Sequence, residues 1–201
     1  MKIGVLGGTF DPIHVAHLAV AREARQKLGL DYVVFIPAGQ PWMKEGRPVS
    51  PANLRLEMVK EAVAKNPFFK VSSLEVESPN PSYTIETILA LRRELGEGVE
   101  LNLILGADAL AQMPQWKNPM QILEICNLVV FDRPGHERTQ KRNSDEPLPG
   151  MSGKIKAIRG PLLSISGTEI RRRVAEGSPI RHLVSESVER FIVENSLYVE
   201  G

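Results

Sequence analysis

Short, unbroken apolar runs alternate with longer segments of helical periodicity along most of this chain. Residues 2–7 (KIGVLG) form one such run, an apolar helical stripe follows over 18–28, and YVVFIP over 32–37 is a second run. Because these runs lack polar alternation, we expect strands that are buried on both faces, as in parallel sheets whose strands are connected by helices. The sequence therefore predicts an α/β fold, a Rossmann-like parallel sheet with helices on both faces.

The same alternation continues through the first two thirds of the chain. A helix is predicted to start at Ser50 and Pro51, with the serine hydroxyl as its N-cap and the proline at the first helical position. The further predicted strands are 68–74, 99–106 and 126–131, with a helix over 84–95. These elements make up a predicted core that ends at residue 134.

The last third differs in composition. Residues 135–153 contain almost no apolar side chains and mix both charge signs with proline and glycine, so we expect an exposed, mobile loop. Residues 154–201 form a small C-terminal part, with short extended segments up to 166 and helices over 168–175 and 185–195. We expect the whole chain, 1–201, to be a single domain.

The composition argues against several classes of protein. The chain has 201 residues and a formal net charge of +1, so no global field attracts nucleic acid or an anionic membrane. The single cysteine, Cys126, cannot form an internal disulfide, and we see neither a signal peptide nor an apolar run long enough to span a bilayer. We therefore expect a cytoplasmic protein that binds a small phosphorylated ligand.

The segment GGTFDPIHVAH, residues 7–17, lies where the first strand passes into its helix. In an open α/β sheet, ligands bind at the carboxyl ends of the strands, so this segment is a candidate binding loop. Gly7 and Gly8 are expected to turn the backbone tightly and to let a ligand approach the main chain, while the first helical amides favour an anion. The spacing matches neither the dinucleotide-binding G-x-G-x-x-G pattern nor a P-loop.

Two histidines in this segment, His14 and His17, are three residues apart and so share one face of a helix that begins near residue 13. There they could donate hydrogen bonds to phosphate oxygens. A packed core histidine beside a surface one is the simpler alternative. A zinc site is disfavoured, because only His136, His182 and one cysteine remain as further histidine or cysteine ligands.

A second cluster, ISGTEIRRR over 165–173, allows two interpretations. Ser166 and Glu169 have the spacing of a capping box, which is a complete structural explanation. Thr168 and Arg171 lie on nearly the same helical face, however, and hydroxyls, free amides and a guanidinium at one helix start could also bind a polyphosphate.

Together, GGTFDPIHVAH and ISGTEIR resemble the motifs of the HxGH nucleotidyltransferase superfamily. Over essentially the full length, the resemblance is closest to the bacterial nicotinate-nucleotide adenylyltransferases, as judged from GGTFDP, PSYTIETI, GADAL, RPG and the ending SLYV. The chain departs from the family pattern at Ala16, where the family has glycine, and at Gly167, where it has serine. Trp42 and Met43 precede Lys44, where family members usually have proline and histidine.

The resemblance implies that ATP and nicotinate mononucleotide react to give nicotinate adenine dinucleotide and pyrophosphate, with Mg²⁺ carried by ATP. It implies catalytic roles for His14, His17, Lys44 and Arg171. The other ATP contacts implied are Gly7, Gly8, Thr9, Phe10, Gly106, Asp108, Arg133, Ser166 and Thr168. The pyridine ring would stack on Trp116, its carboxylate would meet the helix start at Thr84, and Lys44 would also contact this substrate.

The sequence leaves open the roles of two residues, the identity of the acceptor and whether the chain is an enzyme. Asp108 could be a helix N-cap instead of a ribose ligand, and Trp116 could be a core residue. The acceptor could be nicotinamide mononucleotide or phosphopantetheine, or the chain could be a nucleotide-binding regulator without turnover.

Overall fold

Six parallel strands form one sheet in the order β3-β2-β1-β4-β5-β6. The computed structural model describes residues 1–44, 48–132, 151–160 and 165–199. The strands are β1 (Lys2–Gly8), β2 (Tyr32–Pro37), β3 (Phe69–Val71), β4 (Glu100–Gly106), β5 (Cys126–Asp132) and β6 (Ile155–Arg159). The order reverses between β1 and β4, and at such a point the connections leave β1 and β4 in opposite directions and open a crevice at the carboxyl ends of the strands.

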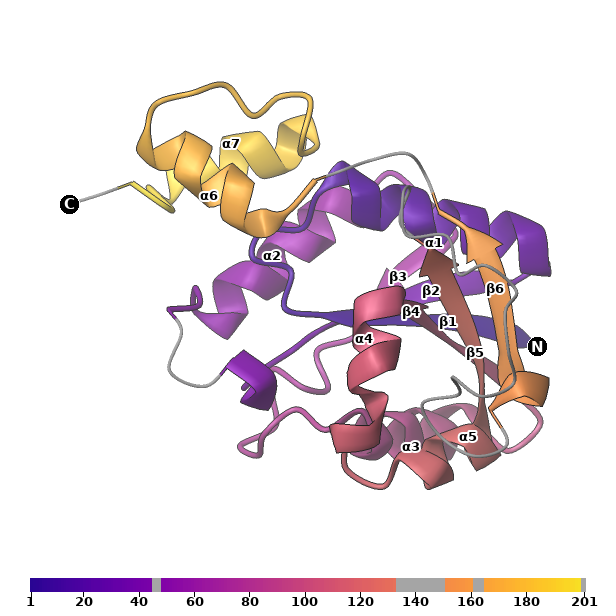
Figure 1. Cartoon of the computed structure of the whole chain (residues 1–201). Coiled ribbons are helices and arrows are strands. Elements are labelled where there is room, and N and C mark those ends of the chain that lie inside the picture. The colour runs from indigo at the N-terminus through magenta and orange to yellow at the C-terminus, as the bar shows by residue number, and fades with distance from the viewer. Residues whose placement is uncertain (45–47, 133–150, 161–164, 200–201) are drawn as a thin grey trace.

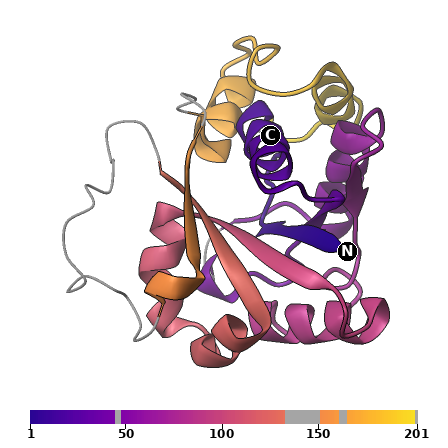
Figure 2. The ribbon, with the colours of Figure 1, turned by 90° about the vertical axis from the view of Figure 1, so that its right-hand side faces the viewer.

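Helices cover both faces of this sheet (Figures 1 and 2). The α-helices are α1 (Val15–Leu28), α2 (Ala52–Val63), α3 (Thr84–Leu95), α4 (Ala107–Gln112), α5 (Pro119–Ile125), α6 (Gly167–Ala175) and α7 (Glu186–Glu194). Short 3-10 helices are η1 (Trp42–Lys44), η2 (Met113–Gln115) and η3 (Ser152–Lys154). In Figure 1, α1 and α2 lie above the sheet, α3 and α5 lie below it, and α7 packs against α2.

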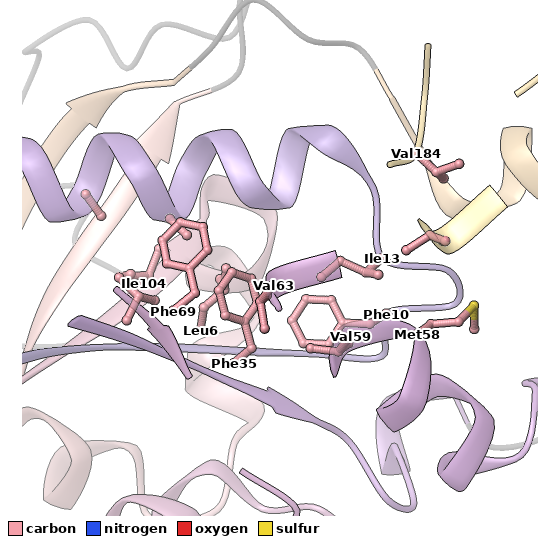
Figure 3. Close-up of a cluster of buried hydrophobic side chains, with 14 of the residues drawn as sticks. Leu6, Phe10, Ile13, Phe35, Met58, Val59, Val63, Phe69, Ile104 and Val184 are labelled. Atoms are coloured by element: carbon pink, nitrogen blue, oxygen red, sulfur yellow. The ribbon is translucent and has the colours of Figure 1, made fainter. Parts of the chain in front are cut away.

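Two apolar clusters hold these layers together. One lies between the sheet and the α1–α2 layer and includes Leu6 and Phe35 from the strands and Met58 from α2 (Figure 3). The other lies on the opposite face and includes Val5 from β1 and Ile88 from α3. Neighbouring residues of one strand, such as Val5 and Leu6, therefore both enter a core, which explains why the strands carry no polar alternation.

The predicted α/β fold is confirmed, and the predicted strands and most predicted helix bounds agree with the structure to within a few residues. The predicted start of α2 was wrong. Pro51 takes the N-cap position, while the Ser50 backbone N–H donates to Asp11 Oδ2 at 3.2 Å. The serine is therefore bound to the loop after β1 instead of capping its own helix.

The exposed loop predicted over 135–153 lies mostly outside the described residues. Its last part was predicted wrongly, because Met151 is fully buried and the 3-10 helix η3 begins at Ser152. Met151 belongs to the apolar cluster on the α3 side of the sheet, so a single methionine in a polar stretch anchors β6 to the core. In the described part of the chain, no helix is long and apolar enough to cross a membrane.

Candidate active site

A cavity of about 570 Å³ lies at the carboxyl ends of β1 and β4, at the point where the strand order reverses. It is lined by residues from both sequence clusters, which are separated by about 150 positions in the chain. The predicted site residues found in its lining are Gly7, Thr9, Phe10, His14, His17, Gly106, Asp108, Ser166, Thr168 and Arg171. Arg133 lies outside the residues that the structure describes.

The two histidines stand together at the start of α1. His14 is the extended N-cap residue, so the helix begins two residues later than predicted and His14 does not lie on its face. The predicted closeness of the two side chains is confirmed, because their rings stack at a centroid distance of 3.6 Å. The His14 backbone N–H donates to His17 Nδ1 at 3.2 Å. Because Nδ1 accepts this bond, the neutral His17 ring carries its proton on Nε2, which makes Nε2 a hydrogen-bond donor.

Phe10 packs against His17. The Phe10 side chain is 3% exposed and points into the apolar cluster on the α1 side of the sheet (Figure 3). Its ring meets the His17 ring edge to face at 5.0 Å and 84°. Its backbone has a positive φ of 49°, which is uncommon for a bulky residue and is held here by this packing.

The two glycines provide space, and the predicted tight turn at these positions was wrong. Gly7 and Gly8 are the last residues of β1 and are not among the residues with positive φ. A Cβ added at Gly7 would meet no atom within 4 Å, because Gly7 borders open cavity. A Cβ at Gly8 would lie 3.2 Å from the Phe10 ring, so this glycine leaves room for Phe10.

The start of α6 faces the same cavity. Ser166 caps the helix by accepting from the Glu169 backbone N–H at 3.2 Å, so the serine half of the predicted capping box is confirmed. The Glu169 carboxylate instead binds Arg172 and Arg173, and these hydrogen bonds lower its pKa to about 2. Of the three successive arginines, only Arg171 lines the cavity.

Arg171 is held against the loop that follows β1. Its Nη1 donates to the Asp11 backbone oxygen at 2.6 Å, and its Nη2 lies 3.4 Å from Thr168 Oγ1. A Cβ added at Gly167 would lie only 2.6 Å from the same Asp11 oxygen. The departure from the family serine at this position therefore allows α6 to lie directly on the loop.

Asp11 links three distant segments of the chain and was missed from the sequence. It is 7% exposed, and its Oδ1 accepts from the Tyr198 hydroxyl at 2.7 Å. Its Oδ2 lies 3.8 Å from Arg171 Nη1 and also accepts from the Ser50 backbone N–H. Burial and the neighbouring Asp11 raise the pKa of Tyr198, which therefore remains a hydrogen-bond donor. The available sequence signal was a carboxylate between phenylalanine and proline within the segment GGTFDP.

Arg55 is a second residue that sequence reasoning missed. It is 1% exposed, and its guanidinium donates to three backbone oxygens: Ser50 at 2.8 Å, Thr9 at 2.7 Å and Gly39 at 3.1 Å. Burial lowers its pKa. Its position three and four residues before the buried Met58 and Val59 places a charge on the apolar face of α2, a pattern that could have identified it.

A second cavity, of about 290 Å³, adjoins the first. Thr84, the first residue of α3, lines it together with Trp116 and Gly8, and Lys44 ends η1 directly after two other lining residues, Trp42 and Met43. The indole nitrogen of Trp116 is buried and has no hydrogen-bond partner among the described residues. Glu75, not predicted from the sequence, also lines this cavity.

Glu75 is partly buried. Its Oε1 accepts from the Thr87 hydroxyl at 2.6 Å, and burial raises its pKa.

Asp108, in the larger cavity, is the second residue of α4, whose N-cap is Gly106. The alternative that Asp108 is an N-cap is therefore wrong.

The two cavities share four lining residues: Gly7, Thr9, Leu105 and Ala109. They therefore meet over the ends of the adjacent strands β1 and β4. Ligands bound in the two cavities would have their near ends at this junction. Within the described ranges, no group of three histidine, cysteine or acidic side chains could hold a metal ion.

The site fits a nucleotidyltransferase, because two histidines at the start of α1 and an arginine of α6 line one crevice where the strand order reverses. The family model described as cytidylyltransferase-like matches residues 5–173. The fold is similar to that of Plasmodium falciparum nicotinic acid mononucleotide adenylyltransferase complexed with NaAD, with a TM-score of 0.76, 18% identity, and coverage of 98% of this chain and 97% of that chain.

Sequence comparison defines the family more closely. A Roseiflexus protein is 46% identical and a Dehalococcoides mccartyi protein is 40% identical, in each case over 98% of this chain and 97% of the relative. Both are named "Probable nicotinate-nucleotide adenylyltransferase". The chain belongs to the nicotinate-nucleotide adenylyltransferase family.

Proposed function

We propose that this chain transfers the adenylyl group of ATP to nicotinate mononucleotide, giving nicotinate adenine dinucleotide and pyrophosphate, a step of NAD biosynthesis. ATP binds in the larger cavity and nicotinate mononucleotide in the smaller one. The observation that carries the proposal is that the two cavities meet at Gly7 and Thr9, and that the histidine pair lines the larger of them. The phosphate of one substrate and the α-phosphorus of the other can therefore meet at a single point.

The reaction forms one P–O bond and breaks another. An oxygen of the mononucleotide phosphate attacks the α-phosphorus of ATP, and the bond to pyrophosphate breaks. The phosphate is already anionic near neutral pH, so no general base is needed. The protein contributes by aligning the two substrates and by neutralising the charge that builds up on the phosphoryl oxygens.

His17 Nε2–H is the donor assigned to the α-phosphate, because His17 Nδ1 already accepts from the His14 backbone. His14 holds neighbouring phosphate oxygens. Arg171 binds the leaving pyrophosphate, and Ser166 and Thr168 add hydroxyls at a helix start, where backbone amides also favour an anion.

Further contacts follow from the family resemblance. Lys44, at the end of η1, and Arg133 would add positive charge near the phosphates. Mg²⁺ enters as part of the substrate, MgATP, since such ions are held mainly by phosphate oxygens and water. Gly106 and Asp108, at the end of β4, are placed to meet the ribose of ATP, the glycine by leaving space and the aspartate by accepting from hydroxyls.

The smaller cavity suits a flat ring with one polar edge. Trp116 offers an aromatic face, and the free amides at the start of α3, beginning with Thr84, can receive the ring carboxylate. A carboxylate is favoured there over a neutral amide because the positive end of the helix dipole lies at this helix start.

The experiment is a pyrophosphate-release assay with ATP and Mg²⁺ and one of three acceptors: nicotinate mononucleotide, nicotinamide mononucleotide or phosphopantetheine. We expect strong preference for nicotinate mononucleotide. Turnover with only one of the other acceptors would contradict the assignment of the smaller cavity. Binding of ATP without release from any acceptor would mean that the chain is a nucleotide-binding protein and not an enzyme of this kind.

A further inference from the structure

We propose that Trp42 contacts the substrate directly and that its indole and that of Trp116 together enclose the pyridine ring of nicotinate mononucleotide. This inference rests on the proposed function. The chain contains two tryptophans, and both line the smaller cavity. Trp42 is not among the residues to which the family resemblance assigns a role.

The two indoles reach the cavity from opposite sides of β1. Trp42 is the first residue of η1, which follows β2, and Trp116 follows β4 by way of α4 and η2. Strands β2 and β4 are the two neighbours of β1 in the sheet, and the end of β1 lies in the cavity wall between them. Apolar strand residues such as Ile36 and Leu103 also line this space. The cavity therefore has an aromatic residue on each flank.

The ring of Trp42 is supported from behind. It packs against the Tyr83 ring at a centroid distance of 5.9 Å and an angle of 44°. Trp42 lines the cavity and Tyr83 is not among the lining residues, so this ring contact lies outside the cavity lining. Lys117 Nζ lies 4.5 Å from the Tyr83 ring centroid and pairs with Glu86, which holds the tyrosine in turn.

The chemistry of the substrate fits this arrangement. The ring nitrogen of nicotinate mononucleotide is bonded to ribose, so the ring is a planar pyridinium cation. The face of an indole is electron-rich and attracts such a cation, and tryptophan is the most effective side chain in this role. A ring between two indoles gains this attraction on both faces, while its carboxylate at the edge stays free for the start of α3.

Steady-state kinetics separate this contact from a general role in folding. Trp42→Leu keeps an apolar residue but removes the aromatic face, so we expect the KM for nicotinate mononucleotide to rise about tenfold with little change in the KM for ATP. Trp42→Phe keeps a flat ring and should recover most of the loss. Equal effects of both variants, or equal changes in both KM values, would overturn the proposal.

Fluorescence tests the contact itself. In the Trp116→Phe variant, Trp42 is the only tryptophan, and its emission is expected to be quenched when nicotinate mononucleotide binds, because the electron-deficient ring lies against it. In the Trp42→Phe variant, the emission of Trp116 is expected to be quenched. Saturating substrate that leaves the emission of Trp42 unchanged would overturn the proposal. Wild-type turnover is measured first, so that failure of the proposed function is recognised separately.

Discussion

The close approach of α6 to the loop after β1 leads to a quantitative prediction for Gly167→Ala. The added methyl carbon would lie 2.6 Å from the Asp11 backbone oxygen, whereas Cβ atoms essentially never come closer than 3.0 Å to such an atom. Both partners are backbone segments, so no flexible side chain can relieve the clash. The start of α6 must move away from the loop by at least 0.4 Å.

This displacement acts on Arg171, whose Nη1 is 2.6 Å from the same oxygen. A misplacement of about 1 Å in a catalytic group can cost on the order of a hundredfold in rate, so, with the role proposed for Arg171, a shift of roughly half that size should lower kcat about tenfold. The expected loss of stability is about 1–3 kcal/mol, the usual cost of an overpacked contact.

The assay is pyrophosphate release under saturating substrates, together with a thermal melt. Gly98→Ala is the matched control, because a Cβ at Gly98 meets no atom within 4 Å and its φ is not positive. We expect this control to keep wild-type kcat and a similar melting temperature. If Gly167→Ala also kept wild-type kcat, the argument that α6 is positioned through this contact would be refuted.

Three further predictions follow from single side chains. His17→Ala should stay folded and lose at least about a hundredfold in kcat, because it removes the proposed donor to the α-phosphate. Circular dichroism and the same assay check this, and near-normal turnover would contradict it. Arg55→Met should lower the free energy of unfolding by about 4 kcal/mol or more, because three backbone oxygens lose a charged donor. Urea titration measures this free energy, and a loss below about 1 kcal/mol would contradict the prediction. Burial raises the pKa of the Cys126 thiol from 9.0 to about 12, so its contribution to stability is present below pH 9 and is lost as the pH rises toward 12. A Cys126→Ala variant should lack this component of alkaline destabilisation, and the native thiol should resist iodoacetamide at pH 9, where an unfolded one reacts.

Much of the fold could be predicted because its signals are local. The apolar runs that became β1, β2 and β5 have no polar alternation, and this follows from helices covering both sheet faces, whatever the order of the strands. The histidine pair could also be predicted, because a spacing of three residues at a helix start brings two rings together without help from any other segment.

Other features could not be predicted because they depend on contacts between distant segments. Arg171 meets Asp11 across 160 positions, Tyr198 meets it across 187, and Arg55 reaches the Thr9 oxygen across 46. No periodicity links such positions. From the sequence, Gly167 is only a missing hydroxyl, while in the structure its lack of a side chain lets α6 lie on the loop.

The sequence by itself determined the class of fold, the location of the candidate binding loop at the end of β1, and the chemical groups proposed to bind phosphate. Only the tertiary structure decided which of these groups face one cavity and what holds them there. The physical reason is that strand and helix preferences arise from neighbours a few residues away along the chain. Other features depend on surfaces that exist only after the sheet has formed: the orientation of Arg171, the burial of Asp11 and the placement of both tryptophans.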